Sequence, residues 1–283
     1  MFRNLSAGAI GYGRSFFEAL RPAKAAGFQG IDIDAGQLLD PASRDRVREA
    51  LEREGMVLGG WGLPVPLLNQ ESEYEAGLER LKTLAPAAAA IGYTRVATWL
   101  PSWSDARDYA ENFAFHVKRL RPVGEVLADH GCRLGLEFLG PKTLRKGHPY
   151  EFIYTVEGML ELCQAVGTGN LGLLLDAWHW YTSGGTVAEL EALRDENVVY
   201  VHINDAPAGI AVEEQIDNVR CLPGETGVID LVGFLRALDK IGYTGPVTPE
   251  PFSAKLREMP EEERLVTAGQ SLLKVWEEAG LGL

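Results

Sequence analysis

Short apolar runs alternate with segments of helical periodicity along the whole chain. The run Leu171–Leu175, which ends at Asp176, has the length and composition of a strand that is buried on both faces. We expect eight strands, at residues 5–10, 28–34, 56–61, 93–99, 133–137, 171–176, 198–202 and 245–250. The intervening segments predict helices, several of them ending at glycine, at residues 15–26, 43–54, 73–91, 105–130, 156–166, 187–194, 231–241 and 261–279. Pro122 is expected to interrupt the 105–130 helix.

Strict alternation of strands and helices predicts parallel strands joined by right-handed helical crossovers. Eight such units close into an α/β fold of the single (β/α)8 TIM-barrel type. An open doubly wound sheet is the competing arrangement, but the segment Gly11–Arg14 lacks the rest of a phosphate-binding fingerprint. No linker of serine and glycine divides the chain, so we expect residues 1–283 to form one domain.

Four predicted strands end at a residue that can bind a metal. These residues are Glu137, Asp176, His202 and Glu250. Because the carboxyl ends of parallel strands meet at one end of a barrel, the four side chains are expected to lie together. Three carboxylates and one imidazole suit one divalent ion, Mn²⁺, Mg²⁺ or Co²⁺, with Zn²⁺ as an alternative. The competing interpretation is that each residue caps the next helix, but none has the sequence pattern of a simple capping box.

The composition argues against nucleic-acid and membrane partners. The formal charge is -13 and the pI is about 4.9, which disfavours a nucleic-acid surface, because phosphate binding needs clustered Lys and Arg. Three scattered cysteines do not form a disulfide framework, and we expect Cys132 and Cys163 to occupy packing positions. We find no signal peptide and no apolar stretch of membrane-spanning length, so a cytoplasmic protein without a membrane partner is expected.

Several stretches resemble one family of TIM barrels. They are Ala25–Asp32, Leu134–Glu137, Leu173–His179, Val201–Asp205 and Pro249–Glu250. Together they resemble the xylose-isomerase-like sugar (phosphate) isomerase/epimerase superfamily, of the ketohexose 3-epimerase or inosose isomerase/dehydratase type. The D-x-x-H motif and the H-x-N-D motif are the most specific part of this resemblance. It implies that the four strand-end residues bind one metal, and that His179 and Arg220 contact substrate oxygens. Asp32 or Asp34 stands where the family has a glutamate.

The residues and the resemblance together predict a metal-dependent isomerase or epimerase of a keto-sugar or cyclitol. Glu137 and Glu250 would transfer protons through an enediolate, while the metal polarises the carbonyl. A lyase or dehydratase on a similar substrate is the near alternative, because the same groups support elimination. A metal-dependent hydrolase and a non-catalytic sugar-binding subunit are further alternatives. The expected partner is a small carbohydrate, and a homo-oligomer is compatible with the sequence.

Other polar and aromatic residues leave alternatives open. Asp205 could orient the imidazole of His202 or join a second metal, and His148 could reach the site from the loop after Glu137. His116 and His130 are expected to be exposed on a helix. Five tryptophans near strand ends fit either the core or a wall against a sugar ring, namely Trp61, Trp99, Trp103, Trp178 and Trp180.

Overall fold

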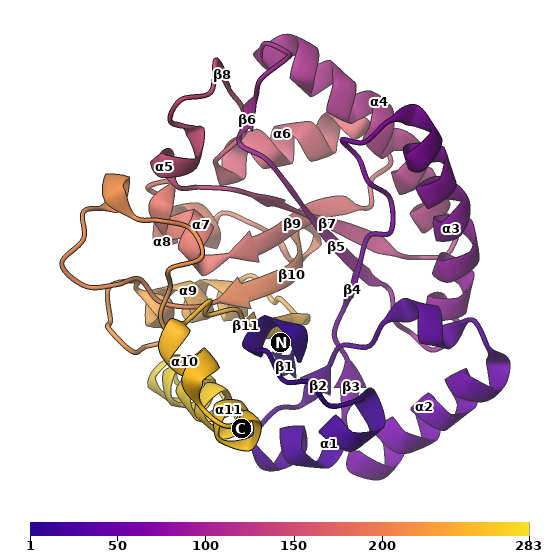
Figure 1. The fold of residues 1–283 in the computed structure, drawn as a ribbon, viewed down its shortest axis with the longest axis vertical. Helices are drawn as coiled ribbons and strands as arrows, with labels where there is room; N and C mark the ends of the chain where they lie inside the picture. Colours follow the sequence, from indigo (N-terminus) through magenta and orange to yellow (C-terminus); the bar gives the residue numbers. More distant parts are fainter. Residues whose placement is uncertain (283) are drawn as a thin grey trace.

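Parallel strands form a closed ring at the centre of the computed structural model, which describes residues 1–282 (Figure 1). The strands are β1 (Phe2–Leu5), β2 (Gly30–Ile31), β3 (Val57–Leu58), β4 (Trp61–Gly62), β5 (Arg95–Leu100), β7 (Arg133–Phe138), β9 (Leu171–Asp176), β10 (Val198–Ile203) and β11 (Pro246–Pro249). Their order in the sheet is β3-β2-β1-β11-β10-β9-β7-β5-β4, and every neighbouring pair is parallel. The two outermost strands, β3 and β4, are consecutive pieces of one chain segment, which closes the ring. The predicted barrel is confirmed.

Helices surround this ring (Figure 1). The longer ones are α1 (Phe16–Ala25), α2 (Pro41–Glu54), α3 (Glu71–Ala89), α4 (Tyr109–Ala128), α6 (Val156–Val166), α9 (Leu231–Lys240) and α11 (Glu261–Glu278). The shorter ones are α5 (Lys142–Arg145), α7 (Ala177–Thr182), α8 (Val187–Glu191) and α10 (Ala254–Glu258). The predicted interruption at Pro122 is wrong, since α4 continues through it. Buried Leu120, Val123 and Leu127 hold the helix against the barrel on both sides of the proline.

The first strand lies earlier than predicted. The structure has β1 at Phe2–Leu5, and a 3₁₀ helix follows at Gly8–Ile10. The hydrophobicity pattern does not predict this strand, because two of its buried residues, Arg3 and Asn4, are polar. The Arg3 Nε–H donates to the carbonyl of Gly27 at 2.8 Å. This hydrogen bond satisfies part of the buried guanidinium, whose Nη1 has no partner among residues 1–282.

The third barrel strand is split into β3 and β4 by Gly59 and Gly60, and a polar cluster inside the barrel explains the break. A Cβ at Gly59 would lie 2.4 Å from Oδ1 of both Asn4 and Asp32, and one at Gly60 would lie 2.7 Å from the Tyr200 ring. The Asn4 amide donates to Asp32 at 2.9 Å, and the Tyr200 hydroxyl donates to Asp32 at 2.7 Å. Only glycine lets the backbone pass this close to the cluster.

The buried core includes two of the three cysteines. Cys132 and Cys163 are free, buried thiols, as predicted, and burial raises the pKa of both, that of Cys132 to about 11. No helix within residues 1–282 combines the length and the apolar character needed to cross a membrane.

His116 is buried inside the molecule, so the prediction that it is exposed is wrong. Its ring stacks on Phe152, with ring centroids 5.2 Å apart, and neither ring nitrogen has a hydrogen-bond partner among residues 1–282. Burial lowers the pKa of His116 to about 4, with a smaller contribution from the positive charges of Arg107 and Arg119. The spacing of His116 from Leu120, Val123 and Leu127, which follow it by four, seven and eleven residues, was the sequence signal for this orientation.

Replacing His116 with Phe should make the protein more resistant to acid. Between pH 6.5 and pH 4 the unfolded chain binds a proton at His116 that the folded chain does not, so stability falls as the pH falls. The loss should reach about 3 kcal/mol near pH 4, at ~1.4 kcal/mol per pKa unit, and it should be absent in the variant. Urea unfolding at pH 7, 5.5 and 4 measures this difference. His130→Gln, just beyond the same helix, should behave as the wild type, and identical slopes for wild type and His116→Phe would refute the explanation.

Candidate active site and metal centre

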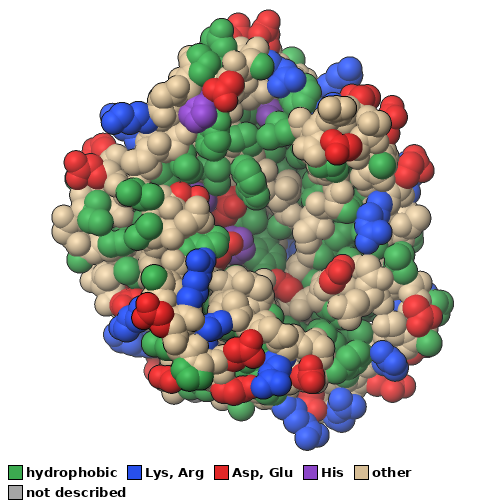
Figure 2. Space-filling model, in the orientation of Figure 1, with side chains coloured by type: hydrophobic (Ala, Val, Ile, Leu, Met, Phe, Trp, Pro, Cys, Tyr) green, Lys and Arg blue, Asp and Glu red, His purple; other side chains and the backbone are tan. Residues whose placement is uncertain are grey.

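Four neighbouring strands bring the predicted ligands together at their carboxyl ends. Glu137 lies on β7, Asp176 on β9 and His202 on β10, and Glu250 directly follows β11. Asp176 and His202 are direct partners in the register of β9 and β10. One ligand atom from each of the four residues lies within 4.8 Å of all the others. Figure 2 shows acidic and histidine side chains in the hollow at the centre of the molecule.

Three carboxylates converge on a single nitrogen of His202. Its Nδ1 lies 3.2 Å from Glu137 Oε1, 3.4 Å from Glu250 Oε2 and 3.7 Å from Asp176 Oδ2. Burial alone would lower the pKa of His202, but the negative charges outweigh burial and raise the pKa to about 10. Burial also raises the pKa of Glu137, to about 7, and that of Glu250. In the absence of a metal, a protonated imidazole therefore holds the carboxylates together.

Arg220 supplies the second positive charge of the cluster. It lies in the loop between β10 and α9 and is buried, with Nη1 2.8 Å from Asp176 Oδ2 and 3.0 Å from Glu250 Oε2. Its Nη2 lies 2.7 Å from Asp217 Oδ1. Although burial opposes ionisation of Asp176, Arg220 keeps the pKa of this carboxyl well below its usual range. Arg220 thus lies at the predicted site, in contact with two of the candidate metal ligands.

His179 also lies in the site, on the first turn of the short helix α7. Asp176 caps this helix by accepting the backbone N–H of Trp178 at 2.6 Å and that of His179 at 3.3 Å, so it is both a cap and a ligand candidate. The His179 Nδ1 accepts the backbone N–H of Gly140 at 3.2 Å, and its Nε2 lies 3.1 Å from Arg220 Nη2. Burial lowers the pKa of His179 to about 4, which keeps the ring neutral.

The donor set fits one divalent cation. Ligand atoms lie ~2.0–2.2 Å from Zn²⁺ or Mg²⁺, so opposite ligands are roughly 4 Å apart, close to the spread of this cluster. Four carboxylates, those of Glu137, Asp176, Asp217 and Glu250, share the site with only one arginine. Oxygen and imidazole donors favour hard to borderline ions over ions that need thiolates.

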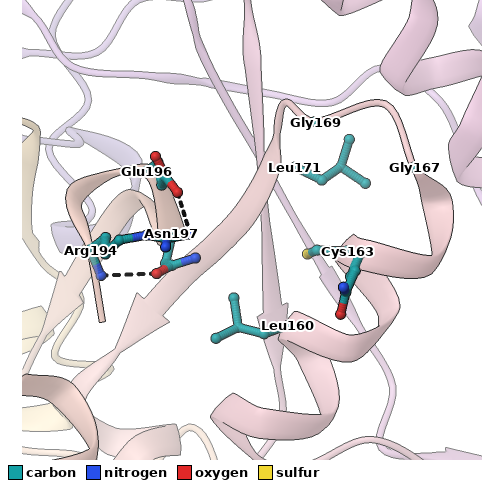
Figure 3. Close-up of a pocket in the computed structure, with 9 residues that line it drawn as sticks. Leu160, Cys163, Gly167, Gly169, Leu171, Arg194, Glu196 and Asn197 are labelled. Atoms are coloured by element: carbon teal, nitrogen blue, oxygen red, sulfur yellow. Dashed lines mark hydrogen bonds and ion pairs between the residues drawn. The ribbon is translucent and has the colours of Figure 1, made fainter. Parts of the chain in front are cut away.

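A cavity of about 340 Å³ lies over this cluster and has both polar and apolar walls. It is lined by Trp99, Trp103, Glu137, Leu139, Leu144, His179, Asp217, Asn218, Arg220, Glu250 and Phe252. The remaining candidate tryptophans, Trp61, Trp178 and Trp180, belong to the core. A larger hollow of about 590 Å³ lies at the opposite end of the strands, beside Leu171 at the start of β9 (Figure 3). Three of its polar residues contact one another, since Asn197 accepts the backbone N–H of Arg194 and the Arg194 guanidinium pairs with Glu196.

Asp205 has neither of the roles considered from the sequence. Its carboxylate accepts the backbone N–H groups of Ala206, Thr226, Gly227 and Ile229 at 2.7 to 3.0 Å. It therefore anchors both ends of the loop that carries Arg220, and it contacts neither His202 nor the metal ligands. The sequence separation of 21 to 24 residues between Asp205 and three of these donors left no local signal for this role.

The remaining candidates occupy the border of the site. His148 lies 2.7 Å from Asp105 and stacks on Trp103, so it supports the wall of the cavity. Asp32 lies in the polar cluster inside the barrel, where burial raises its pKa to about 6. Asp34 instead caps a 3₁₀ helix by accepting the N–H of Gly36.

Sequence reasoning missed two residues of the site. Asn204 donates its amide to both oxygens of Asp176 at 3.3 Å, and Asp217 pairs with Arg220. Asn204 belongs to the H-x-N-D motif, and its place in this motif was the sequence feature that could have identified it. The position of Asp217 depends on the folding of a long loop, which the sequence pattern does not specify.

Known proteins resemble this chain over its whole length or large parts of it. An inosose isomerase from Halalkalibacterium halodurans is 30% identical over 162 residues, 56% of this chain and 53% of that protein. A 3-dehydroshikimate dehydratase from Pseudomonas aeruginosa is 29% identical over 267 residues, 90% of this chain and 39% of that protein. A ketose 3-epimerase from Arthrobacter globiformis is 26% identical over 261 residues, 89% of this chain and 83% of that protein. The matched parts thus span about half or less of the first two relatives.

Solved structures agree with this relationship. A xylose isomerase domain protein from Alicyclobacillus acidocaldarius has a TM-score of 0.86 and 31% identity, covering 99% of both chains. A structure of IOLI protein with a bound zinc atom has the same fold, with a TM-score of 0.80, 21% identity and 99% coverage of both chains. The model of the family described as xylose isomerase-like TIM barrel matches residues 20–275. The chain therefore belongs to the xylose isomerase-like TIM barrel family.

Proposed function

We propose that this protein is a divalent-metal-dependent isomerase or epimerase of a keto-sugar or cyclitol, with residues 1–283 acting as one domain. The observation that carries the proposal is the pair Glu137, which is buried, and Glu250, which is mostly buried, within one candidate metal centre. Burial raises the pKa of both glutamates. The family relatives include an inosose isomerase and a ketose 3-epimerase, which support this class of reaction.

Glu137, Asp176, His202 and Glu250 would hold the cation, which is Mn²⁺, Mg²⁺, Co²⁺ or Zn²⁺. Bound there, the metal supplies Lewis acidity at a substrate carbonyl. The zinc atom in the structure of IOLI protein supports a metal in this fold. Because His202 presents Nδ1 to the three carboxylates, it must release a proton to bind the metal.

Glu137 and Glu250 are the proposed proton-transfer groups. They come from β7 and β11, and the strands of Asp176 and His202 lie between them in the sheet. Two carboxylates held apart in this way can act on different sides of one bound carbon. In the metal-free site burial raises the pKa of Glu137 to about 7, the direction that suits a group which takes up a proton. One glutamate removes the proton next to the carbonyl, and the other returns a proton to the opposite face or to the neighbouring carbon.

His179 and Arg220 are the proposed substrate-binding residues. A neutral imidazole has one acceptor nitrogen, and the N–H of Gly140 already donates to Nδ1 of His179. The Nε2–H of His179 and the Nη2 of Arg220 are therefore two donors that face each other at 3.1 Å. A carbonyl or hydroxyl oxygen of the substrate that lies beside them can accept a hydrogen bond from both.

Elimination of water from a keto-sugar or a related substrate is the second candidate reaction. It requires the same proton removal next to a carbonyl, and the dehydratase from P. aeruginosa matches over 90% of this chain. An acidic substrate is disfavoured, because Arg220 is the only Lys or Arg that lines the cavity and it already pairs with three carboxylates.

Mn²⁺ should stabilise the wild-type protein and should not stabilise Asp176→Ala. A ligand that binds only the folded state at 100 times its dissociation constant adds about 2.7 kcal/mol to the free energy of unfolding. Thermal unfolding with excess Mn²⁺ and with chelator measures this difference. Asp230→Ala, which removes a helix cap outside the site, should lower the Tm in both conditions but keep the Mn²⁺-dependent rise. An equal rise in Asp176→Ala would place the metal elsewhere.

Glu137→Gln and Glu250→Gln should each retain metal but lose solvent deuterium exchange at the substrate position that the remaining glutamate does not serve. An amide oxygen can still coordinate a cation, whereas an amide cannot take up a proton. The assay is proton NMR or mass spectrometry of a panel of keto-sugars and inososes incubated in D₂O, with metal content measured in parallel. Glu213→Gln, which changes an exposed residue that is neither a candidate ligand nor part of the cavity lining, is the matched control. Normal exchange in both active-site variants would show that other groups carry the proton.

A further inference from the structure

The cavity over the candidate metal centre has two chemically different ends. Its inner end is formed by polar side chains that are buried, among them Glu137, His179 and Arg220. Its outer end, toward solvent, consists of Trp99, which is 55% exposed, of the half-buried Trp103, Leu144 and Phe252, and of the exposed amide of Asn218. Hydrophobic side chains border the central hollow in Figure 2. An exposed tryptophan beside a concave site is a feature that apolar ligands use.

Trp103 is fixed in the outer end by a small sheet that is separate from the barrel. The strand β6 (Trp103–Ser104) pairs in antiparallel fashion with β8 (Tyr150–Glu151), so the loops after β5 and β7 hold each other. His148 stacks on Trp103 with ring centroids 4.7 Å apart, and Asp105 fixes His148 through a 2.7 Å contact. Because these contacts hold the indole before any ligand arrives, little entropy is lost when a ligand packs against it.

Phe252 contributes a second preset aromatic wall. Its φ is 37°, a backbone conformation that bulky side chains rarely adopt. The ring lies over the guanidinium of Arg220, with 4.8 Å between the Arg220 Cζ and the ring centroid. Strained backbone of this kind is found mainly where the position of a side chain matters for binding or catalysis.

The outer end offers few partners to hydroxyl groups. Trp99, Trp103, Leu144 and Phe252 form its apolar wall, and Asn218 is its exposed polar side chain. Arg220, the only Lys or Arg among the described residues that lines the cavity, is already paired. A sugar ring could stack a C–H face on the tryptophans, but most of its hydroxyl groups would find no partner there except Asn218, and an anionic group would find no free counter-charge. A flat uncharged ring would instead cover the exposed aromatic surface.

We propose that the outer end of the cavity is a binding subsite for an uncharged aromatic group attached to the carbohydrate substrate. The substrate class is then an aryl-substituted sugar, such as an aryl glycoside bearing a ketone, with its sugar ring at the polar inner end. This proposal rests on the proposed function, because the inner end must hold the carbohydrate. Trp99 and Trp103 are the main specificity-determining residues.

Binding of two non-reacting analogues tests the subsite without any need for turnover. Isothermal titration calorimetry of the Mn²⁺-loaded protein should show that phenyl β-D-glucopyranoside binds at least tenfold more tightly than methyl β-D-glucopyranoside. Trp99→Ala and Trp103→Ala should each reduce this preference severalfold, and the double variant should abolish it. Phe17→Ala, which removes an exposed aromatic ring on the outer helix α1, should keep the full preference. Trp99 is more than half exposed, so its replacement leaves the fold intact.

Equal affinities of the two glycosides for the wild type would overturn the subsite, as would failure of the phenyl glycoside to bind at millimolar concentration. A phenyl preference that survives the double variant would also overturn it. The deuterium-exchange assay separates this proposal from the proposed function. If the wild-type protein shows no deuterium exchange but keeps a phenyl preference that depends on the tryptophans, the proposed reaction alone is refuted. If it shows exchange without that preference, the subsite alone is refuted.

Discussion

Electrostatic repulsion among buried carboxylates is the constraint on which the rest of this structure depends. Glu137, Asp176 and Glu250 end three strands of one barrel, and their oxygens lie within 3.7 Å of the same His202 nitrogen. Because burial removes water from these charges, their repulsion must be offset by protons or cations. Arg220 and a protonated His202 do so in the structure described here, and a divalent cation in place of the His202 proton would do so more completely.

The architecture keeps these charges close together and fixed. The four candidate ligands come from consecutive strands of the ring, so hydrogen-bonded backbone sets their spacing. The loop that delivers Arg220 is long, but Asp205 anchors it through four backbone N–H groups. Inside the barrel, Asp32 accepts hydrogen bonds from Asn4 and Tyr200, which ties β1 and β10 to the segment after β2. A site held this rigidly can place two proton-transfer groups on either side of a substrate carbon.

The sequence predicted the barrel and the four strand-end residues because both follow from periodicity. Alternating strands and helices imply parallel strands, and parallel strands bring their carboxyl ends together. Features that depend on contacts distant in the sequence escaped prediction. Asn4 is buried in a strand that looks polar, and Asp205 meets donors more than twenty residues away. His116 was misjudged because residue type was given more weight than its place on the buried face of α4. The apolar wall of the cavity depends on loops, whose shape periodicity does not specify.

The most direct test of the central claim is an anomalous diffraction experiment on crystals grown with Mn²⁺. The account predicts one strong anomalous peak that lies ~2.2 Å from side-chain atoms of Glu137, Asp176, His202 and Glu250. Well-ordered density for these four side chains with no peak between them, or a peak at another position, would contradict it.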